Sequence, residues 1–338
     1  MIINSIAPCR ICDIGGWTDT YFAKTGEVLN IAIYPYVKVQ LIVEKRRKNK
    51  QQIVVYADSY GEQFGFDASE FINDKHALIR GAFKIMNIPD DLQISAHIHS
   101  DMPPGASTGT SAAVSVALIG AINQLKNHFS TYTIPLLAHR VETEILKIQC
   151  GIQDQLASTY GGINKISITN YPSYYNNQVS LFNDVWWELE RRLMLVYLGH
   201  SHNSSDIHNE VIQKFTNNDT ELTPKLNELR QLANDSVQFL EKGNFEDFAD
   251  IMNKNTNIQR SLHKCIMSED ACKIETLAFD CNAIGVKLNG AGGNGGSVTI
   301  LFGPDEYDKI NFAKKLSNVV PMARIIPIYL SRRGLRVW

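Results

Sequence analysis

The chain has 338 residues, of which 44% are hydrophobic and 20% charged, a composition typical of a globular protein with one large or two medium domains. Its 33 basic and 35 acidic residues give a formal net charge of −2, so no overall positive field would attract nucleic acid. Six scattered cysteines and an amino terminus unlike a secretory signal favour a cytoplasmic location. The longest apolar helix candidate, residues 112–122, is shorter than the roughly 20 residues of a membrane span, and we expect no membrane association.

The first third of the chain is predicted to be rich in β-strands. Strands are expected at residues 2–7, 37–43, 52–57 and 92–99, where β-branched or alternating apolar residues occur. The basic run at residues 45–50 separates two of these strands. We interpret it as a solvated hairpin turn in preference to a phosphate-binding patch.

Helical spacing begins after the last of these strands. Small and apolar residues predict a helix at 110–125, and apolar residues repeat at helical intervals over 136–148. A further helix is expected at 154–159 and should end before the glycine pair at 161–162. A strand is expected next, at 163–168. The middle of the chain is therefore predicted to be largely helical.

An apolar strand candidate at residues 193–198 follows a polar stretch rich in Tyr, Ser and Asn. We place a domain boundary just before it, which divides the chain into residues 1–190 and 191–338. Long polar-faced helices are expected next, and then two strands at 284–288 and 297–302. No internal repeat is visible.

Residues 101–113, with the sequence DMPPGASTGTSAA, lie between a predicted strand and a predicted helix. Glycines let the backbone curve around an anion, and the helix start offers unpaired N–H groups and the positive end of the helix dipole. The segment therefore suits the phosphates of a nucleotide, although it lacks the lysine of a P-loop. The alternative is an ordinary loop in which Thr110 or Ser111 caps a core helix.

A second glycine-rich segment, residues 287–296, contains a formal G-x-G-x-x-G at Gly290, Gly292 and Gly295. A dinucleotide fingerprint requires a helix directly afterwards, whereas a strand is predicted here. This context argues against a nicotinamide dehydrogenase. Two interpretations remain, namely a glycine loop placed against a substrate and a flexible hairpin turn.

Two acidic residues, Glu142 and Asp154, are a dozen residues apart, one in a predicted helix and one just after a glycine. Two such carboxylates can serve one site, one for Mg²⁺ and one beside an accepting hydroxyl. In isolation, we interpret them as a solvated helix face and a first-turn acid favoured by the helix dipole, in preference to a shared site.

Residues 7–19, with the sequence APCRICDIGGWTD, precede these three segments. Taken in chain order, these four segments resemble the motifs of the GHMP kinases, the superfamily that contains galactokinase, homoserine kinase, mevalonate kinase and phosphomevalonate kinase. The resemblance extends from residue 7 to about 301. Within the superfamily the chain is most similar to the D-glycero-D-manno-heptose 7-phosphate kinases, which phosphorylate the anomeric oxygen on the path to nucleotide-activated heptose.

The resemblance implies an α+β fold of two domains, with an N-terminal domain like ribosomal protein S5 domain 2 and a ferredoxin-like C-terminal domain. The active site would lie in the cleft between them and use ATP and Mg²⁺, with a small-molecule sugar phosphate as acceptor. A homodimer is compatible with the resemblance, but the sequence does not determine the oligomeric state. Alternative activities are phosphorylation of fucose, galactose or arabinose, and non-catalytic sensing of sugar and nucleotide on the same fold.

The resemblance also implies roles for single residues. Asp154 would lie beside the attacking hydroxyl, and Arg10 would pair with Asp154 or with the transferring phosphoryl group. Mg²⁺ would be held by Ser111 and Glu142. The residues that would surround the ATP phosphates are Pro104, Gly105, Ala106, Ser107, Thr108, Gly109, Thr110 and Ser111.

Five further residues are expected at the acceptor side by the same resemblance. Gly16, Thr18 and Asp19 would contact the sugar hydroxyls, and Gly292 and Gly293 would close the floor of the site.

The chain departs from the family pattern at several positions. Ser107 stands where the family has glycine, so the phosphate loop is expected to curve differently or to bind nucleotide more weakly. Asn294 replaces a common glycine, which asparagine tolerates better than most residues. Cys12 and Asp13 are more polar than the apolar pair expected there, and the sequence offers no physical reason. Residues 199–206 could contact a distal phosphate of the sugar.

Overall fold

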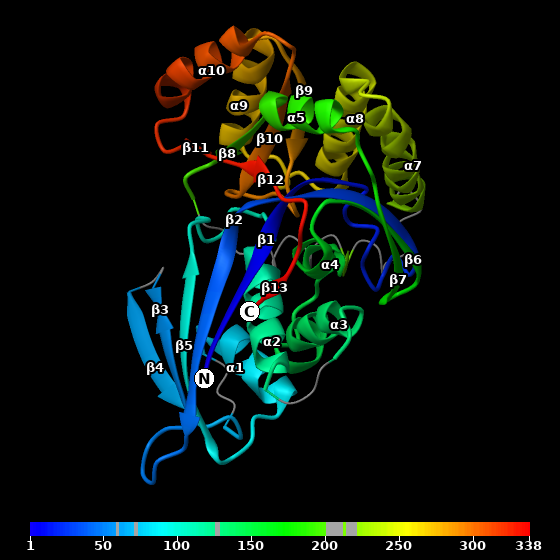
Figure 1. The fold of residues 1–338 in the computed structure, drawn as a ribbon. Coiled ribbons are helices and arrows are strands. Elements are labelled where there is room, and N and C mark those ends of the chain that lie inside the picture. Colours follow the sequence, from blue (N-terminus) through cyan, green and yellow to red (C-terminus); the bar gives the residue numbers. More distant parts are fainter. Residues whose placement is uncertain (59–60, 71–73, 126–128, 201–211, 214–221) are drawn as a thin grey trace.

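The protein folds into two β-sheets with helices packed against both (Figure 1). The computed structural model describes residues 1–58, 61–70, 74–125, 129–200, 212–213 and 222–338. Within these ranges no helix combines the length and the apolar character that crossing a bilayer requires. The mixed α and β composition agrees with the expected class.

Among the described residues the first sheet has nine strands, in the order β13-β1-β2-β5-β3-β4, with β6 and β12 also paired to β2, and β7 paired to β6. The long strand β2 is its centre, because it pairs with β1 and β5 along one part and with β6 along another. The strands are β1 (Ile2–Ile14), β2 (Gly26–Lys45), β3 (Ile53–Ala57), β4 (Glu62–Phe66), β5 (Leu92–Ser100), β6 (Ile163–Asn170), β7 (Ser173–Gln178), β12 (Tyr329–Leu330) and β13 (Arg336–Val337).

The helices of this half are α1 (Ala77–Met86), α2 (Thr110–Asn123), α3 (Thr133–Arg140), the π-helix η2 (Val141–Ile145) and α4 (Gln153–Tyr160). Helix α2 packs against β1 and β2 and is buried almost throughout, because its sequence is apolar on all sides. Figure 1 shows α1 to α4 gathered on one face of the sheet. The helices predicted near residues 110, 136 and 154 are confirmed, except that the second ends in the π-helix.

The basic run at residues 45–50 joins β2 to β3, as predicted, but it is not a hairpin turn. Strand β5 lies between β2 and β3, pairing antiparallel with β2 and parallel with β3. The prediction of a hairpin was wrong because β5, which follows β3 in the chain, inserts between two strands that are neighbours in sequence. Such an insertion leaves no local sequence signal.

The second sheet has four antiparallel strands in the order β11-β8-β10-β9. Helix α8 packs on β9, and α7 contacts both α8 and the long strand β2 of the first sheet. The elements are α5 (Asn183–Arg192), β8 (Leu193–Tyr197), α7 (Leu222–Glu241), α8 (Phe245–Leu262), α9 (Glu269–Asp280), β9 (Ala283–Leu288), β10 (Ser297–Phe302), α10 (Glu306–Val319) and β11 (Arg324–Ile326). The three strands predicted in this half are confirmed.

The last residues of the chain return to the first sheet. Ser5 pairs with Val337 and Ile6 with Arg336, which places the C-terminus beside the N-terminal strand (Figure 1). The division into residues 1–190 and 191–338 stays a prediction. Strands β12 and β13, from the second half of the chain, pair with β2 and β1 of the first half.

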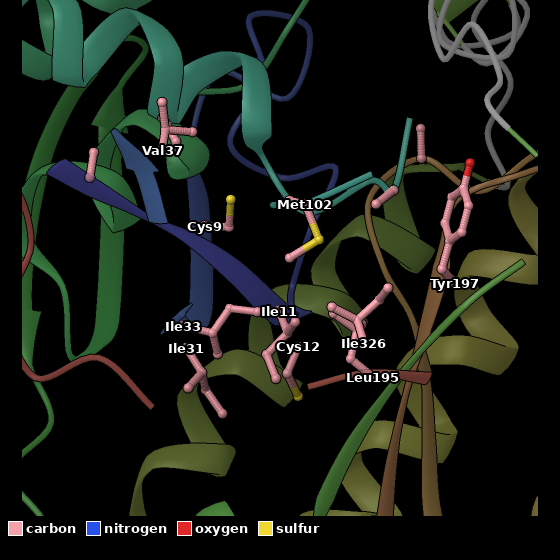
Figure 2. Close-up of a cluster of buried hydrophobic side chains, with 14 of the residues drawn as sticks. Cys9, Ile11, Cys12, Ile31, Ile33, Val37, Met102, Leu195, Tyr197 and Ile326 are labelled. Carbon is pink, nitrogen blue, oxygen red and sulfur yellow. The ribbon is translucent and has the colours of Figure 1, made fainter. Parts of the chain in front are cut away.

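The two sheets share one continuous hydrophobic core. Figure 2 shows part of it, where Cys9 and Ile11 of β1 lie in the same buried cluster as Leu195 of β8 and Ile326 of β11. All four side chains are almost inaccessible to solvent. The shared core holds the end of β1 firmly against the second sheet, which is where the candidate site is built.

Candidate active site

A cavity of about 480 Å³ lies where β1, the loop before α2, the start of α4 and the loop after β9 meet. Arg10, Glu142 and Asp154 line this cavity, as do Asp19 and the whole of residues 104–111. Segments more than 130 residues apart in the chain therefore contribute to one site. The structure brings together the side chains for which the sequence predicted catalytic, nucleotide and metal roles, and those roles stay predictions.

The loop before α2 presents the helix N-terminus to the cavity. Gly109 is the residue preceding the helix and has a φ of 69°, while Ser107 has a φ of 56°. Ser107 thus adopts the left-handed conformation that glycine would favour, at a cost of about 1 kcal/mol. Its backbone carbonyl accepts a hydrogen bond from Arg10 Nη1 at 2.5 Å, which helps to hold this conformation. The exposed Ser111 follows in the first turn of the helix.

Arg10 and Asp154 form an ion pair at the centre of the cavity. The distance from Arg10 Nε to Asp154 Oδ1 is 2.7 Å, and the Arg10 side chain is 4% exposed whereas that of Asp154 is 27% exposed. Burial opposes the charged form of Arg10, but Asp154 and Asp13 outweigh it and raise the pKa of the guanidinium. Asp154 lies in the first turn of α4, so its carboxylate also faces the positive end of that helix.

Asp19 is a second acid of the cavity and is nearly inaccessible to solvent. Its Oδ2 atom accepts a hydrogen bond from the backbone N–H of Gln153 at 3.0 Å, which ties the loop after β1 to the start of α4. Burial, with a smaller contribution from Asp154, raises the pKa of Asp19 to about 6 despite this hydrogen bond. A side chain on Gly151 would collide with this carboxylate, since its Cβ would lie 1.9 Å from Asp19 Oδ2.

Glu142 lies in the π-helix η2, a distortion that often accompanies functional sites because it displaces one side chain from the regular helical pattern. The side chain is buried, and Gln155 Nε2 donates to its Oε1 at 3.1 Å. Burial, then the charge of Asp154, raises the pKa of Glu142 to about 7. Among the described residues, Glu142 forms no ion pair.

These features fit a hard divalent cation. Glu142 supplies a carboxylate with no cationic partner in the described part of the chain, and Ser111 supplies an exposed hydroxyl on the same cavity. Buried Gln155 Oε1, beside Glu142, has no hydrogen-bond partner among the described atoms. Mg²⁺ prefers such oxygen ligands and would offset the negative charge that raises the pKa of Glu142.

Four residues expected at the acceptor side do not line the cavity. Thr18 is fully buried, and its hydroxyl donates to Gly15 O at 2.7 Å, while the Gly16 N–H donates to Asp13 O. Gly292 and Gly293 lie against residues 266–267, because the Gly293 N–H donates to Ile266 O at 2.8 Å. Gly290 and Ala291 of the same loop line the cavity instead.

Residues that the sequence did not assign to the site complete the wall. Asp13 and Trp17 lie near Arg10 and Asp19, and Lys75 and His76 come from the segment before α1. The side chains of Lys75 and His76 both pair with Glu62, at 2.7 and 2.9 Å. No sequence motif marks this second group, because its members meet only where the segment before α1 packs beside β4. The segment expected to contact a distal phosphate, residues 199–206, lies outside the described residues from residue 201 onward.

Comparisons with known proteins show which proteins this chain is similar to. The family model described as GHMP kinases N terminal domain matches residues 77–162. The chain is 28% identical to the D-glycero-alpha-D-manno-heptose 7-phosphate kinase of Campylobacter jejuni, covering 99% of this chain and 98% of that protein. It is 24% identical to the bifunctional fucokinase/GDP-fucose pyrophosphorylase of Arabidopsis thaliana, covering 87% of this chain and 29% of that protein.

A solved structure shares the fold over the full length. The D-glycero-D-manno-heptose 1-phosphate kinase from Bacteroides thetaiotaomicron superposes with a TM-score of 0.77 at 20% identity, covering 99% of this chain and 98% of that one. At this identity the likeness establishes the fold.

Proposed function

We propose that the chain is a kinase of the GHMP superfamily, and that it transfers the γ-phosphate of ATP to the anomeric hydroxyl of D-glycero-D-manno-heptose 7-phosphate, giving the 1,7-bisphosphate. The observation that carries this proposal is the Arg10 and Asp154 ion pair facing the N-terminus of α2 in one cavity. Similarity to the heptose 7-phosphate kinase over nearly the whole chain supports the choice of acceptor.

Phosphoryl transfer depends mainly on positioning and on neutralising charge around a loose transition state. The N–H groups at the start of α2 would bind the ATP phosphates, and Arg10 would offset charge on the transferring group. The second carboxylate oxygen of Asp154 accepts no hydrogen bond from the described residues, so it is available to the acceptor hydroxyl. Asp154 would orient this hydroxyl and accept its proton, a small demand because an anomeric hydroxyl is relatively acidic.

Glu142 and Ser111 would hold Mg²⁺, which when bound shields the charge of the ATP phosphates. Gln155 would keep the Glu142 carboxylate turned toward the cavity through its 3.1 Å hydrogen bond. Asp19 would bind a sugar hydroxyl from the opposite wall. We further propose that residues 1–190 form a domain like ribosomal protein S5 domain 2 and residues 191–338 a ferredoxin-like domain, whose four-stranded antiparallel sheet supports the second assignment.

A second candidate acceptor is an unphosphorylated monosaccharide. The basic side chains among the described lining residues are Arg10, Lys75 and His76, and each already has a carboxylate partner. The described part of the cavity therefore offers no uncommitted cation for a second phosphate. The similarity to a fucokinase favours the same alternative.

An acceptor panel distinguishes the two candidates. The purified protein is assayed with ATP and Mg²⁺ against heptose 7-phosphate, the same heptose without phosphate, fucose, galactose and arabinose, and phosphorus NMR assigns the position of the new phosphate. We expect the highest kcat/KM with heptose 7-phosphate and a product phosphorylated at the anomeric oxygen. Turnover confined to unphosphorylated sugars would refute the heptose phosphate proposal, and ATP binding without turnover would indicate a sensor.

A further inference from the structure

A buried ion pair joins the end of β1 to the end of β9. Asp13, at the end of β1, is 1% exposed, and Lys287, at the end of β9, is fully buried. The Nζ atom of Lys287 lies 3.3 Å from Oδ1 of Asp13, although the two residues are 274 positions apart in the chain. This pair accounts for the polar residue at position 13, where the family pattern led us to expect an apolar one.

Asp13 also anchors the glycine loop. The backbone N–H of Gly290 donates to both carboxylate oxygens, at 3.2 Å to Oδ1 and 3.1 Å to Oδ2. Gly290 in turn packs on the phosphate loop, since a Cβ atom placed on it would lie 3.1 Å from Ser107 Cβ and 3.6 Å from Arg10 Nη2. One carboxylate therefore sets how closely the second half of the chain approaches the phosphate-binding loop.

Positive and negative side chains alternate from buried Lys287 to the residues that line the cavity. Lys287 pairs with Asp13, and Asp13 Oδ1 lies 4.0 Å from Arg10 Nη1. Arg10 Nε in turn lies 2.7 Å from Asp154 Oδ1. Without the ammonium group, Asp13 would place an uncompensated negative charge beside Arg10 and compete with Asp154 for its guanidinium. An uncompensated negative charge would also repel the phosphates of a bound nucleotide.

The ammonium group of Lys287 is held in place by other contacts. It donates to Gln259 Oε1 at 3.0 Å and to the backbone oxygen of Leu288. Burial lowers the pKa of Lys287, and the charge of Asp13 partly opposes that effect. Among the described residues Asp13 is the carboxylate that pairs with this lysine, and the ion pair favours the charged forms of both groups.

We propose that Asp13 and Lys287 are positioning residues for phosphoryl transfer: Lys287 neutralises Asp13, so that Arg10 stays directed at Asp154 and at the transferring phosphate, while Asp13 anchors Gly290. This inference rests on the proposed kinase function. Neither residue contacts the reacting atoms, so their effect passes through Arg10 and through the glycine loop.

The test compares Lys287→Met, Asp13→Asn and the double variant that carries both changes. Methionine removes the charge while keeping an unbranched side chain, and asparagine keeps the shape and one oxygen acceptor of Asp13. The matched control is Arg192→Met, because Arg192 is a buried cation whose Nε lies 2.7 Å from Glu188 Oε1 and which does not line the cavity. For each variant, thermal unfolding, the dissociation constant of ATP with Mg²⁺, and kcat with the best acceptor are measured at pH 8.

For Lys287→Met we expect ATP to bind about 5-fold more weakly and kcat to fall at least about 10-fold, the scale of one uncompensated charge near the phosphates. Adding Asp13→Asn should reverse most of the loss of ATP affinity and recover at least about 5-fold in kcat, because it removes the uncompensated charge. The Arg192→Met control should lower thermal stability with ATP affinity and kcat within about 2-fold of wild type.

A purely structural role would give a different pattern, in which Lys287→Met lowers stability while ATP affinity and kcat per folded molecule match those of the control. That result, or a double variant no better than Lys287→Met in both properties, would overturn the proposal. If Lys287→Met does not fold, the comparison of Asp13→Asn with the double variant still tests the proposal. The proposal requires the double variant to bind ATP and to turn over at least as well as Asp13→Asn alone. A wild-type protein without turnover on any acceptor would refute the proposed function, and the ATP measurements would still test the charge pair.

Discussion

The guanidinium of Arg10 and the carboxylate of Asp154 are 2.7 Å apart across 144 residues of chain, and the Asp154 side chain is 27% exposed whereas that of Arg10 is 4% exposed. This difference in exposure suits the two side chains to different roles. Buried Arg10 is held by Asp154 and by the phosphate loop, whereas the partly exposed Asp154 keeps one oxygen free for a bound acceptor. Four predictions test this arrangement.

Replacing Asp154 by asparagine should preserve ATP binding while turnover falls by at least roughly 100-fold, the usual scale for loss of a general base or an orienting group. The amide keeps an oxygen that can accept from Arg10 Nε, so the fold should be little changed. ATP affinity is measured by calorimetry and turnover with the best acceptor. Asp184→Asn, on the first turn of α5, is the control, because it also removes a helix N-terminal acid, outside the cavity. Unchanged turnover in Asp154→Asn would remove Asp154 from the mechanism.

Glu142→Gln should stabilise the metal-free protein at pH 8 and abolish the effect of Mg²⁺ on nucleotide affinity. Burial raises the pKa of Glu142 from 4.5 to about 7, so its contribution to stability is complete below pH 4.5 and is lost as pH rises through 7. A shift of that size corresponds to at most roughly 3 kcal/mol. Glutamine keeps the oxygen that accepts from Gln155 without acquiring charge.

Denaturant unfolding at pH 5 and pH 8 measures this change. The exposed neighbour Glu144 provides the control variant Glu144→Gln, whose effect should stay within about 0.5 kcal/mol at both pH values. Equal stability of Glu142→Gln and wild type at pH 8 would contradict the prediction.

The acceptor kcat/KM should fall as pH drops through about 6. Burial, with help from Asp154, raises the pKa of Asp19 to about 6, so the carboxylate is ionised above that pH and becomes protonated below it. If the ionised form binds a sugar hydroxyl, kcat/KM declines by about 10-fold per pH unit on the acid side. The variant Asp19→Asn should have a lower kcat/KM and should lack this acid limb. An acid limb that persists unchanged in the variant would assign it to another group.

Gly109→Ala should reduce turnover far more than Gly61→Ala. Both glycines have positive φ values, 69° and 62°, so alanine at either costs about 1 kcal/mol of stability. At Gly109 the new methyl group would lie 3.0 to 3.1 Å from the side chain of Asp154, whereas nothing lies within 4 Å at Gly61. Thermal unfolding and kcat measured on both variants separate the shared backbone effect from the displacement of Asp154. Similar turnover in the two variants would show that Asp154 tolerates the contact.

Much of the local structure could be predicted from sequence alone. The strand near residue 92, the helix from residue 110 and the paired strands around the glycine loop all follow from apolar spacing and from turn residues. The predicted phosphate loop proved to precede a helix, with Ser107 in the left-handed conformation, so the expected change of loop curvature at this residue is not required. These features depend on neighbouring residues, which is why a local pattern reveals them.

Contacts between distant segments required the tertiary structure. The sequence contained Asp13 and Lys287 but no sign that they meet, and it pointed to Gly292 and Gly293 where the loop places Gly290 against the cavity. It likewise offered no sign that β5 separates β2 from β3 or that the C-terminus pairs with β1. Sequence alone determined which chemical groups and which local conformations are available to this protein. The packing of the two sheets on a shared core decided which of those groups face one another, because burial and pairing over hundreds of residues depend on the whole fold.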